Sequence, residues 1–270
     1  IRAALSGCIT NTDPAYVREG MFGIAPRSFE AVVRKAAPMP GFEDDAAAQE
    51  AADVLNEFIE NSRKVLEASE VNRRRIDQGK PAANFILTRS AGDRLPRFPQ
   101  VSDIYGMKCG CFVQMPVERG IALLTGMEIV EVPRSTGLLD VDYPVWAKIA
   151  ADSLNRFDCL YVHIKGPDDP GHDGDCMDKK AVIEAIDAHY IGNLISTLKL
   201  EDYIICVTSD LCTVCQMKAH SALPVPVLIS GGSIKPDGSM SFSEKTAKLG
   251  SLGEVRAREI LPLLVKYACG

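Results

Sequence analysis

The sequence predicts an α/β fold in which a mostly parallel sheet is covered by helices, accompanied by part of a smaller α/β domain. Short apolar segments alternate with amphipathic ones through the second half of the chain, as in parallel strands joined by helices. Hydrophobic residues make up 46% of the 270 residues, enough for a substantial core. The proline-rich segment Leu95–Pro99 separates two halves of different character. We therefore expect two domains, residues 1–100 and 101–270.

The first domain is expected to combine two strands with two helices. From Asp44 to Ser69, apolar residues recur at three- and four-residue spacing, as they do on one face of a helix. The next helical pattern stops before Gly79 and Pro81, two residue types that end helices. In chain order, we predict a strand over residues 3–10, a turn over 11–14, helices over 44–69 and 71–78, and a strand over 84–89.

The second domain is expected to carry the main sheet. Its strands are short apolar runs, and most of them are followed by a longer stretch of helical periodicity. The predicted strands cover residues 108–114, 128–132, 158–164, 203–208 and 226–230. The predicted helices cover residues 116–125, 143–155, 178–199 and 253–267.

Acidic and histidine side chains lie beside the predicted strands of this second domain. Asp168 and His172 belong to the glycine- and proline-rich segment Gly166–Asp175, directly after a predicted strand. Asp210 ends the next strand, and His220 precedes the last one. Open α/β sheets hold their chemistry at the carboxyl ends of parallel strands, so we expect these side chains on one edge. Such a mixed set of oxygen and nitrogen ligands favours Mn²⁺ or Zn²⁺ over Ca²⁺ or Mg²⁺.

These residues also have a purely structural explanation. The acidic segment is equally a solvated turn that caps the following helix, because Asp175 and Asp178 stand at its start. His220 is alternatively a hydrogen-bonded loop histidine. The occurrence of such residues at three neighbouring junctions favours a metal site over these alternatives.

Charge and composition exclude several classes of protein. The chain has 36 acidic and 30 basic residues, a formal net charge of −6 and no basic stripe, so nucleic acid is not an expected partner. No apolar run approaches the roughly 20 residues that span a bilayer, and no signal peptide is visible. The nine scattered cysteines are typical of reduced thiols in a cytoplasmic protein.

Four segments together resemble one family. They read VHIKGPDDPGHDGD (162–175), VTSD (207–210), AHSALPVPVLISGG (219–232) and FSEKTAKLGSLG (242–253). The chain resembles the archaeal-type cofactor-independent (2,3-bisphosphoglycerate-independent) phosphoglycerate mutases, which belong to the alkaline phosphatase superfamily. This resemblance implies an alkaline phosphatase-like fold. Residues 1–100 would be part of the inserted substrate-binding domain, and residues 101–270 the C-terminal part of the metal-binding core.

The resemblance also implies a metal centre. Asp168, His172 and His220 would bind the first metal ion. Asp210 would bind the second, together with a histidine after it, an N-terminal aspartate and a serine nucleophile. Mn²⁺ is the expected metal, with Zn²⁺, Co²⁺ or Mg²⁺ as alternatives.

The substrate implied by the resemblance is a small phosphorylated acid. The family converts 3-phosphoglycerate to 2-phosphoglycerate in glycolysis and gluconeogenesis. Arg89 and Lys165 are candidates for contacting the phosphate or carboxylate of such a substrate, and each is alternatively a surface cation.

This chain departs from the family at two positions of the expected centre. No serine matches the motif of the nucleophile, because the family's N-terminal segment has no counterpart here. Leu211 stands where the family has a metal-binding histidine, and leucine offers no ligand atom. We therefore expect one metal site and no mutase turnover from this chain alone. Cys212 and Cys215 have the C-x-x-C spacing. This spacing indicates a redox pair or half of a soft-metal site, or it is a coincidence.

Three functions remain open on the sequence. The first is a phosphoglycerate mutase-like enzyme of which this chain is the C-terminal portion. The second is a catalytically decayed homologue that acts as a metal- or ligand-binding module. The third is a related phosphatase or phosphonate hydrolase. Strand edges left uncovered by the missing segment favour pairing with another chain, so we expect either a homo-oligomer or a sheet edge covered by rearranged segments.

Overall fold

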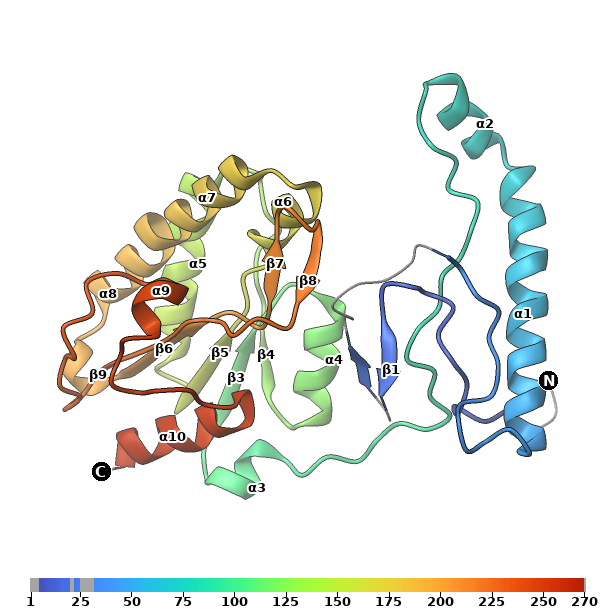
Figure 1. Ribbon diagram of the computed structural model, residues 1–270. Coiled ribbons are helices and arrows are strands. Elements are labelled where there is room, and N and C mark those ends of the chain that lie inside the picture. The colour runs from blue at the N-terminus through green and yellow to red at the C-terminus, as the bar shows by residue number, and fades with distance from the viewer. Residues whose placement is uncertain (1–4, 20–21, 25–31, 270) are drawn as a thin grey trace. The chain divides into compact units, whose positions relative to one another are not determined.

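The chain divides into two compact units, Ile1–Pro96 and Arg97–Gly270. The computed structural model describes residues 5–19, 22–24 and 32–269 (Figure 1). The division falls within the proline-rich segment Leu95–Pro99. The assignment of the first unit to an inserted substrate-binding domain stays a prediction.

Two consecutive helices dominate the first unit, as predicted. The first begins after Asp45, whose side chain accepts a hydrogen bond from the backbone N–H of Ala47. The second begins after Ser69, which caps it in the same way through Val71. These helices are α1 (Ala46–Glu67) and α2 (Glu70–Asp77).

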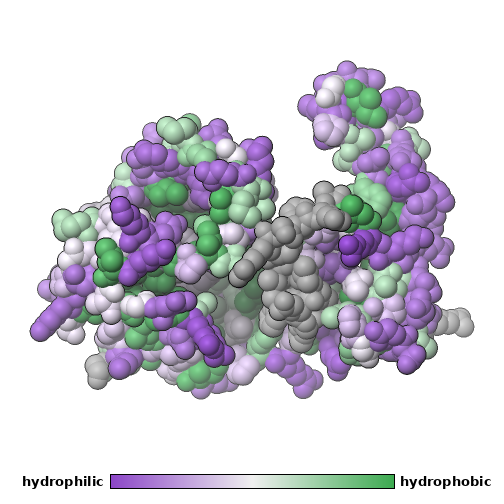
Figure 2. All heavy atoms as spheres, viewed as in Figure 1, coloured by the Kyte–Doolittle hydropathy of each residue, from purple (hydrophilic) through white to green (hydrophobic). Residues whose placement is uncertain are grey.

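Small side chains line the buried face of α1. Ala48 and Ala52 are at most 1% exposed, and they let the segments that carry Ile9 and Ala36 pack closely against the helix. The opposite side of α1 is covered mainly by hydrophilic side chains (Figure 2). α1 is therefore an amphipathic helix that supplies one wall of a small core.

The two strands predicted for the first unit are wrong over the described residues. From residue 5 to residue 10 there is only an isolated bridge between Ile9 and Pro38, and proline cannot donate to a ladder. Residues 84–89 form no strand, because Thr88 pairs with the turn at Thr12 and Asp13 instead of with a second strand. The predicted turn over residues 11–14 is present. The strands of this unit form an unpredicted antiparallel pair, β1 (Val17–Glu19) and β2 (Phe22–Ile24).

A parallel sheet of strand order β4-β3-β5 forms the centre of the second unit, as predicted. Helical crossovers join these strands, which is the connection that parallel neighbours require. The strands are β3 (Cys109–Phe112), β4 (Glu128–Val130) and β5 (Cys159–Val162). The crossover helices are α4 (Pro116–Leu124) and α5 (Leu139–Ser153).

Side chains of β3 alternate between two cores on opposite faces of this sheet. Phe112 packs with Tyr143 and Trp146 of α5. Cys111 packs instead with Ala122 of α4. The alternation follows from the two-residue period of a strand, and it places α5 and α4 on opposite faces (Figure 1).

The long helix predicted over residues 178–199 is present as three joined segments. They are α7 (Cys176–Ala185), a π-helical turn η1 (Ile186–Ile191) and α8 (Gly192–Thr197). The π-helical turn buries Tyr190 in the core formed with α5. A π-helical turn holds about one residue more than an α-helical turn, so η1 interrupts an otherwise regular α-helix.

The last two predicted strands pair with each other, and they run antiparallel. A hairpin that the sequence did not predict lies between them. The strands are β6 (Ile204–Thr208) and β9 (Val227–Gly231), and the hairpin consists of β7 (Cys212–Val214) and β8 (Ala219–Ser221).

The remaining elements of the second unit are short, apart from its last helix. They are α3 (Val101–Tyr105), η2 (Leu200–Asp202), α9 (Glu244–Ala247) and α10 (Ala257–Cys269). α10 starts later than the predicted residue 253, because Gly253 has a positive φ of 71°, outside the helical range. None of the helices in the described ranges has the length and apolarity needed to cross a membrane.

Candidate metal centre

The segment that follows β5 is a short helix rather than the loop that its prolines and glycines suggested. This helix, α6 (Asp168–Asp173), starts three residues after Lys165. Asp168 and His172 are four residues apart and therefore lie on one face of it. The predicted capping role of the acidic segment is confirmed, because Asp175 caps α7 by accepting from the N–H groups of Met177 and Asp178.

The β7–β8 hairpin carries His220 to the face of α6. Ligand atoms of Asp168, His172 and His220 all lie within 4.8 Å of one another, and we call these three residues the triad. The rings of His172 and His220 are 4.6 Å apart between centroids, in an edge-to-face arrangement. The expected position of His220 at a third strand–helix junction is wrong. His220 lies on β8, the second strand of the β7–β8 hairpin. This hairpin connects β6 to β9, and these two strands run antiparallel, so no strand–helix junction forms there.

Thr213, a residue of β7 that the sequence did not single out, connects two members of the triad. Its hydroxyl donates to Asp168 Oδ1 at 2.6 Å, and the same oxygen lies 3.1 Å from His220 Nδ1. Thr213 is only 5% exposed, so this contact is shielded from water. A buried hydroxyl between a carboxylate and an imidazole fixes the orientation of both.

The hydrogen bonds also determine which nitrogen of each histidine is free. His172 Nδ1 lies 3.1 Å from the carbonyl oxygen of Lys218, which can only accept, so this nitrogen carries the proton. The Thr213 proton is used on Asp168, so His220 Nδ1 donates to the Thr213 oxygen. In both rings Nε2 is left with its lone pair. His172 Nε2 lies 3.5 Å from Asp168 Oδ1.

Electrostatics favour, at Asp168 and His220, the protonation states that a cation needs. Burial disfavours the charged form of Asp168, but hydrogen bonds from Lys165 and Thr213 outweigh it and lower the pKa of this carboxyl. Burial also lowers the pKa of His220, although the charge of Asp168 opposes this effect. The resulting set is one carboxylate with neutral imidazole at His220, a donor set that fits Mn²⁺ or Zn²⁺.

Two glycines allow α6 to approach the hairpin. A Cβ on Gly171 would lie 2.9 Å from Thr213 Cγ2, closer than carbon atoms pack. Gly174 ends α6 with a φ of 81°, and a Cβ there would lie 2.7 Å from Lys218 Cε. A larger residue at Gly171 would separate the two segments that form the triad, whereas at Gly174 the flexible end of Lys218 can move and the left-handed φ is what disfavours a side chain.

The other predicted site residues have different surroundings. Lys165 forms an ion pair with Asp168, and although burial opposes its charge, this contact raises its pKa. Asp210 is exposed, and its Oδ1 accepts from the N–H of Leu211. Arg89 belongs to the first unit, where its guanidinium stacks on the ring of Tyr16 at 3.9 Å. The ligand roles of Asp168, His172, His220 and Asp210, and the substrate roles of Arg89 and Lys165, stay predictions.

A second polar pair lies at the carboxyl end of β5. His163 Nδ1 is 3.8 Å from Oε1 of Glu118 on α4, and both side chains are largely buried. His163 Nδ1 and Glu118 Oε2 have no hydrogen-bond partner within the described part of the chain. No sequence signal marked this pair, because its members come from two elements far apart in the sequence.

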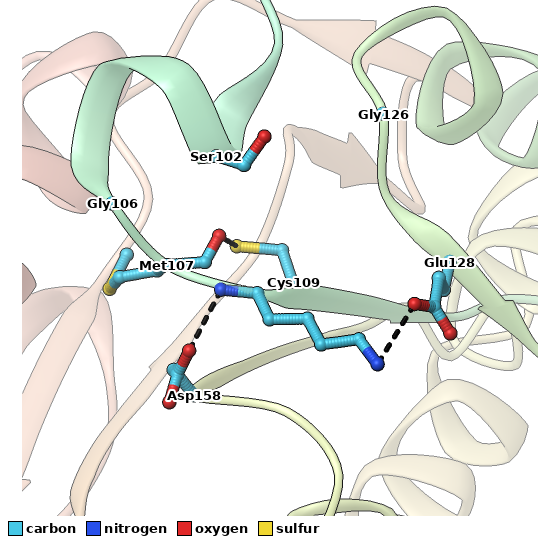
Figure 3. A pocket seen from close by; sticks show the side chains of 8 residues that line it. Ser102, Gly106, Met107, Cys109, Gly126, Glu128 and Asp158 are labelled. Atoms are coloured by element: carbon cyan, nitrogen blue, oxygen red, sulfur yellow. Dashed lines mark hydrogen bonds and ion pairs between the residues drawn. The ribbon is translucent and has the colours of Figure 1, made fainter.

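A cavity of about 500 Å³ lies at the opposite, amino-terminal end of the parallel strands (Figure 3). Its charged groups are already paired. Lys108 Nζ is 3.0 Å from Glu128 Oε1, and the Lys108 N–H donates to Asp158 at 2.8 Å. This cavity therefore offers less unpaired chemistry than the triad.

Comparison with known proteins decides the family. The sequence model described as the Metalloenzyme superfamily matches residues 42–267. The chain belongs to this superfamily. The predicted resemblance and the predicted fold class are both confirmed, since the similar curated proteins are archaeal phosphoglycerate mutases.

Two of these mutases illustrate how much of a relative the chain covers. It is 38% identical over 257 residues to the 2,3-bisphosphoglycerate-independent phosphoglycerate mutase of Aeropyrum pernix, covering 93% of this chain and 59% of that protein. It is 36% identical over 226 residues to the mutase of the same name from Methanoculleus marisnigri, covering 84% of this chain and 54% of that protein. The chain thus spans less than two thirds of these relatives.

One solved structure shares the fold over the full chain. The PH0037 protein from Pyrococcus horikoshii is 26% identical and superimposes with a TM-score of 0.70. The match covers 100% of this chain and 76% of that one. Both units of this chain therefore have counterparts in that solved structure.

Proposed function

We propose that this member of the metalloenzyme superfamily supplies the metal-binding part of a phosphoglycerate mutase-like centre. The proposed reaction moves a phosphoryl group between the hydroxyls of glycerate, from 3-phosphoglycerate to 2-phosphoglycerate. The observation that carries the proposal is the convergence of Asp168, His172 and His220 to within 4.8 Å. The mutase names of the curated relatives support the substrate class, a small phosphorylated acid.

Mn²⁺ is the proposed metal, and Asp168, His172 and His220 are its proposed ligands. Two imidazole nitrogens and one carboxylate suit Mn²⁺, Zn²⁺ or Co²⁺, whereas Mg²⁺ prefers oxygen ligands alone. When bound, such an ion supplies positive charge that neutralises phosphoryl oxygens as charge develops on them.

The protein's own residues prepare this centre. Thr213 holds Asp168 and His220 in fixed orientations through its single hydroxyl. The Lys218 carbonyl does the same for His172. Lys165 is 37% exposed in its side chain and remains charged, so we propose that it attracts the phosphate or carboxylate of the substrate. Arg89 is proposed for the same class of contact.

We propose that the 270-residue chain binds one metal ion and does not turn over phosphoglycerate by itself. Asp210 offers one carboxylate, and Leu211 offers no ligand atom where the family has a histidine. Leu211 is the observation that favours the alternative of a metal-binding module without mutase activity. The proposed reaction belongs to glycolysis or gluconeogenesis, and we propose a cytoplasmic location and a homo-oligomer.

Metal titration of the purified chain tests the triad. Isothermal titration with Mn²⁺ is expected to give one site per chain, and anomalous scattering from Mn²⁺-soaked crystals is expected to give one peak between the triad side chains. Absence of both signals would contradict the metal assignment.

An activity assay tests the second part of the proposal. Conversion of 3-phosphoglycerate by the Mn²⁺-loaded chain is expected to stay at the background rate. Measurable conversion would contradict the incomplete-centre assignment while leaving the metal site intact.

Light scattering tests the oligomer, and a monomer at high concentration would contradict that expectation.

A further inference from the structure

Two cysteines lie side by side where neighbouring strands of the parallel sheet begin. Cys109 is the first residue of β3, and Cys159 is the first residue of β5. They are directly opposite each other in the parallel ladder, and both thiols are free. Because they are 50 positions apart in the sequence, no short motif marks them.

The two-residue period of the strands puts both side chains on the same face of the sheet. Cys111, two residues after Cys109, packs with Ala122 of α4. Leu160, the residue after Cys159, packs against the core on the α5 side. Since neighbouring residues of a strand point to opposite faces, Cys109 and Cys159 both point to the α4 side.

Hydrogen bonds hold the starts of these two strands together. The Lys108 N–H donates to Asp158 Oδ2 at 2.8 Å, and the Asp158 N–H donates to the Lys108 carbonyl oxygen at 2.9 Å. The Cys159 N–H donates to the same carbonyl oxygen at 3.3 Å. The ladder therefore sets the separation of the two cysteines before any ligand arrives, at the about 4.8 Å of neighbouring strands.

The cavity at the amino-terminal end of the strands gives access to this pair. Cys109 is among the residues that line it (Figure 3). The Cys109 thiol donates at 3.9 Å to the carbonyl oxygen of Met107, which is a long contact from a weak donor. Cys159 is half-buried. An ion that enters the cavity therefore displaces little when it reaches the thiols.

We propose that Cys109 and Cys159 bind one soft monovalent metal ion, Cu(I), as two thiolate ligands in a nearly linear arrangement. Thiolates are the ligands that select Cu(I) over harder cations. A metal–thiolate bond is about 2.3 Å long, so a two-coordinate ion spans about 4.6 Å between its sulfurs. This span matches the about 4.8 Å between paired strands.

The same spacing disfavours two other uses of the pair. A disulfide needs Cβ atoms about 3.8 Å apart, which is closer than residues opposite each other on neighbouring strands lie. Zn²⁺ takes four ligands. Over the residues that the structure describes, the triad is the one group of three or more histidine, cysteine or acidic side chains that converges on a single point. Two thiolates complete the coordination of a linear ion.

Binding exchanges two protons for the ion. Burial raises the pKa of the Cys109 thiol to about 11 and also raises the pKa of Cys159, so both thiols are neutral without metal. When Cu(I) binds, two copper–sulfur bonds form and both protons go to solvent. The copper keeps its oxidation state, and the bis-thiolate complex carries a net charge of −1. No oxidant or reductant takes part in this exchange.

This site and the triad are at opposite ends of the same strand. Cys159 begins β5, whereas Asp168 and His172 belong to the helix that follows its carboxyl end. The two sites also differ in donor type, since the triad offers oxygen and nitrogen and the pair offers sulfur. The inference therefore does not depend on the proposed function.

The test uses the full, reduced chain without oxygen, and Cu(I) is supplied from a chromophoric chelator. Competition is expected to show that the affinity for the first ion falls at least 100-fold in Cys109→Ser and in Cys159→Ser. Cys212→Ser, which disrupts the C-x-x-C spacing, is the matched control and should keep that affinity. Unchanged affinity in Cys159→Ser, or an equal loss in Cys212→Ser, would overturn the proposal.

Scattering and absorption at the copper edge test the position without any substitution. Crystals of the wild-type chain with one equivalent of Cu(I) are expected to give an anomalous peak between the sulfurs of Cys109 and Cys159. X-ray absorption is expected to show two sulfur neighbours around the copper. A peak between Cys212 and Cys215, or copper with three or more ligands, would contradict the linear site.

Discussion

Two aspartates that follow successive strands of the chain, Asp168 after β5 and Asp210 after β6, have different surroundings. The side chain of Asp168 is 17% exposed, and it accepts from Lys165 and Thr213 while facing two histidines. Asp210 is exposed, and its Oδ1 accepts from its neighbour's backbone. Asp210 is nevertheless close enough to contribute to the raised pKa of Tyr161.

The difference shows what a metal position requires beyond a carboxylate at a strand end. The Asp168 position is built by a helix, a hairpin and a buried threonine, so its donors converge before any ion arrives. At the Asp210 position the next residue is Leu211, and nothing nearby in the sequence supplies a nitrogen donor. Preorganisation, rather than charge alone, distinguishes the two positions.

The largest expected effect comes from removing the carboxylate of the triad. Asp168→Asn should weaken Mn²⁺ binding by at least about 100-fold, more than the about 10–100-fold expected from loss of a supporting group. The negative charge of Asp168 compensates the positive charge of the cation at this site. Isothermal titration measures the affinity, and Asp173→Asn, an exposed aspartate on the same helix, is the matched control. Equal affinities for the two variants would contradict the assignment.

The next effect in size comes from Thr213, which touches two triad members. Thr213→Val keeps the shape of the side chain but removes the hydroxyl that donates to Asp168 and accepts from His220. Mn²⁺ binding should weaken by about 10–100-fold. Thr208→Val on β6 is the control, since that hydroxyl donates to the carbonyl of Pro226 instead. A loss as large in Thr208→Val would mean that general destabilisation causes it.

A smaller effect is expected on the titration of His220. Burial lowers its pKa below the ordinary 6.5, and the charge of Asp168 partly restores it. Without metal, the NMR midpoint of His220 should therefore lie below 6.5, and Asp168→Asn should lower it further. Because the neutral ring is favoured in the folded state, this group's stabilising contribution is present above pH 6.5. It is lost as pH falls through the folded-state pKa.

His220→Gln identifies the resonance among the chain's four histidines. A midpoint above 6.5, or an upward shift in Asp168→Asn, would contradict the buried position of His220 beside a carboxylate.

Much of the second unit could be predicted because its local patterns agree with its fold. Apolar runs of β3, β5 and β6 are strong local signals there, as the periodicity of α1 is in the first unit. The β7–β8 hairpin escaped prediction because its turn has none of the Asn-Gly or Asp-Gly signals. It places Lys218 at a φ of 51° instead. The predicted strand over residues 84–89 failed because Thr88 pairs with the turn at Thr12 and Asp13, through backbone and hydroxyl groups, rather than with a second strand.

The triad was predictable, whereas its support was not. Aspartate and histidine beside apolar strands carry a chemical signal that sequence reading detects. Thr213 carries none, because a threonine in a strand is ordinary, and only the tertiary fold brings it between Asp168 and His220.

The smallest expected effect comes from changing Asp210, the aspartate without convergent donors. Asp210→Asn should weaken Mn²⁺ binding at the triad by only about 2-fold at low salt. Its exposed charge acts on the triad through solvent and is screened over roughly 10 Å at 0.1 M salt. Leu211→His should leave the stoichiometry at one ion per chain, because two donors on an exposed segment do not form a site. A loss of about 100-fold in Asp210→Asn would make Asp210 a ligand of the same ion, and the contrast between the two aspartates would then be wrong.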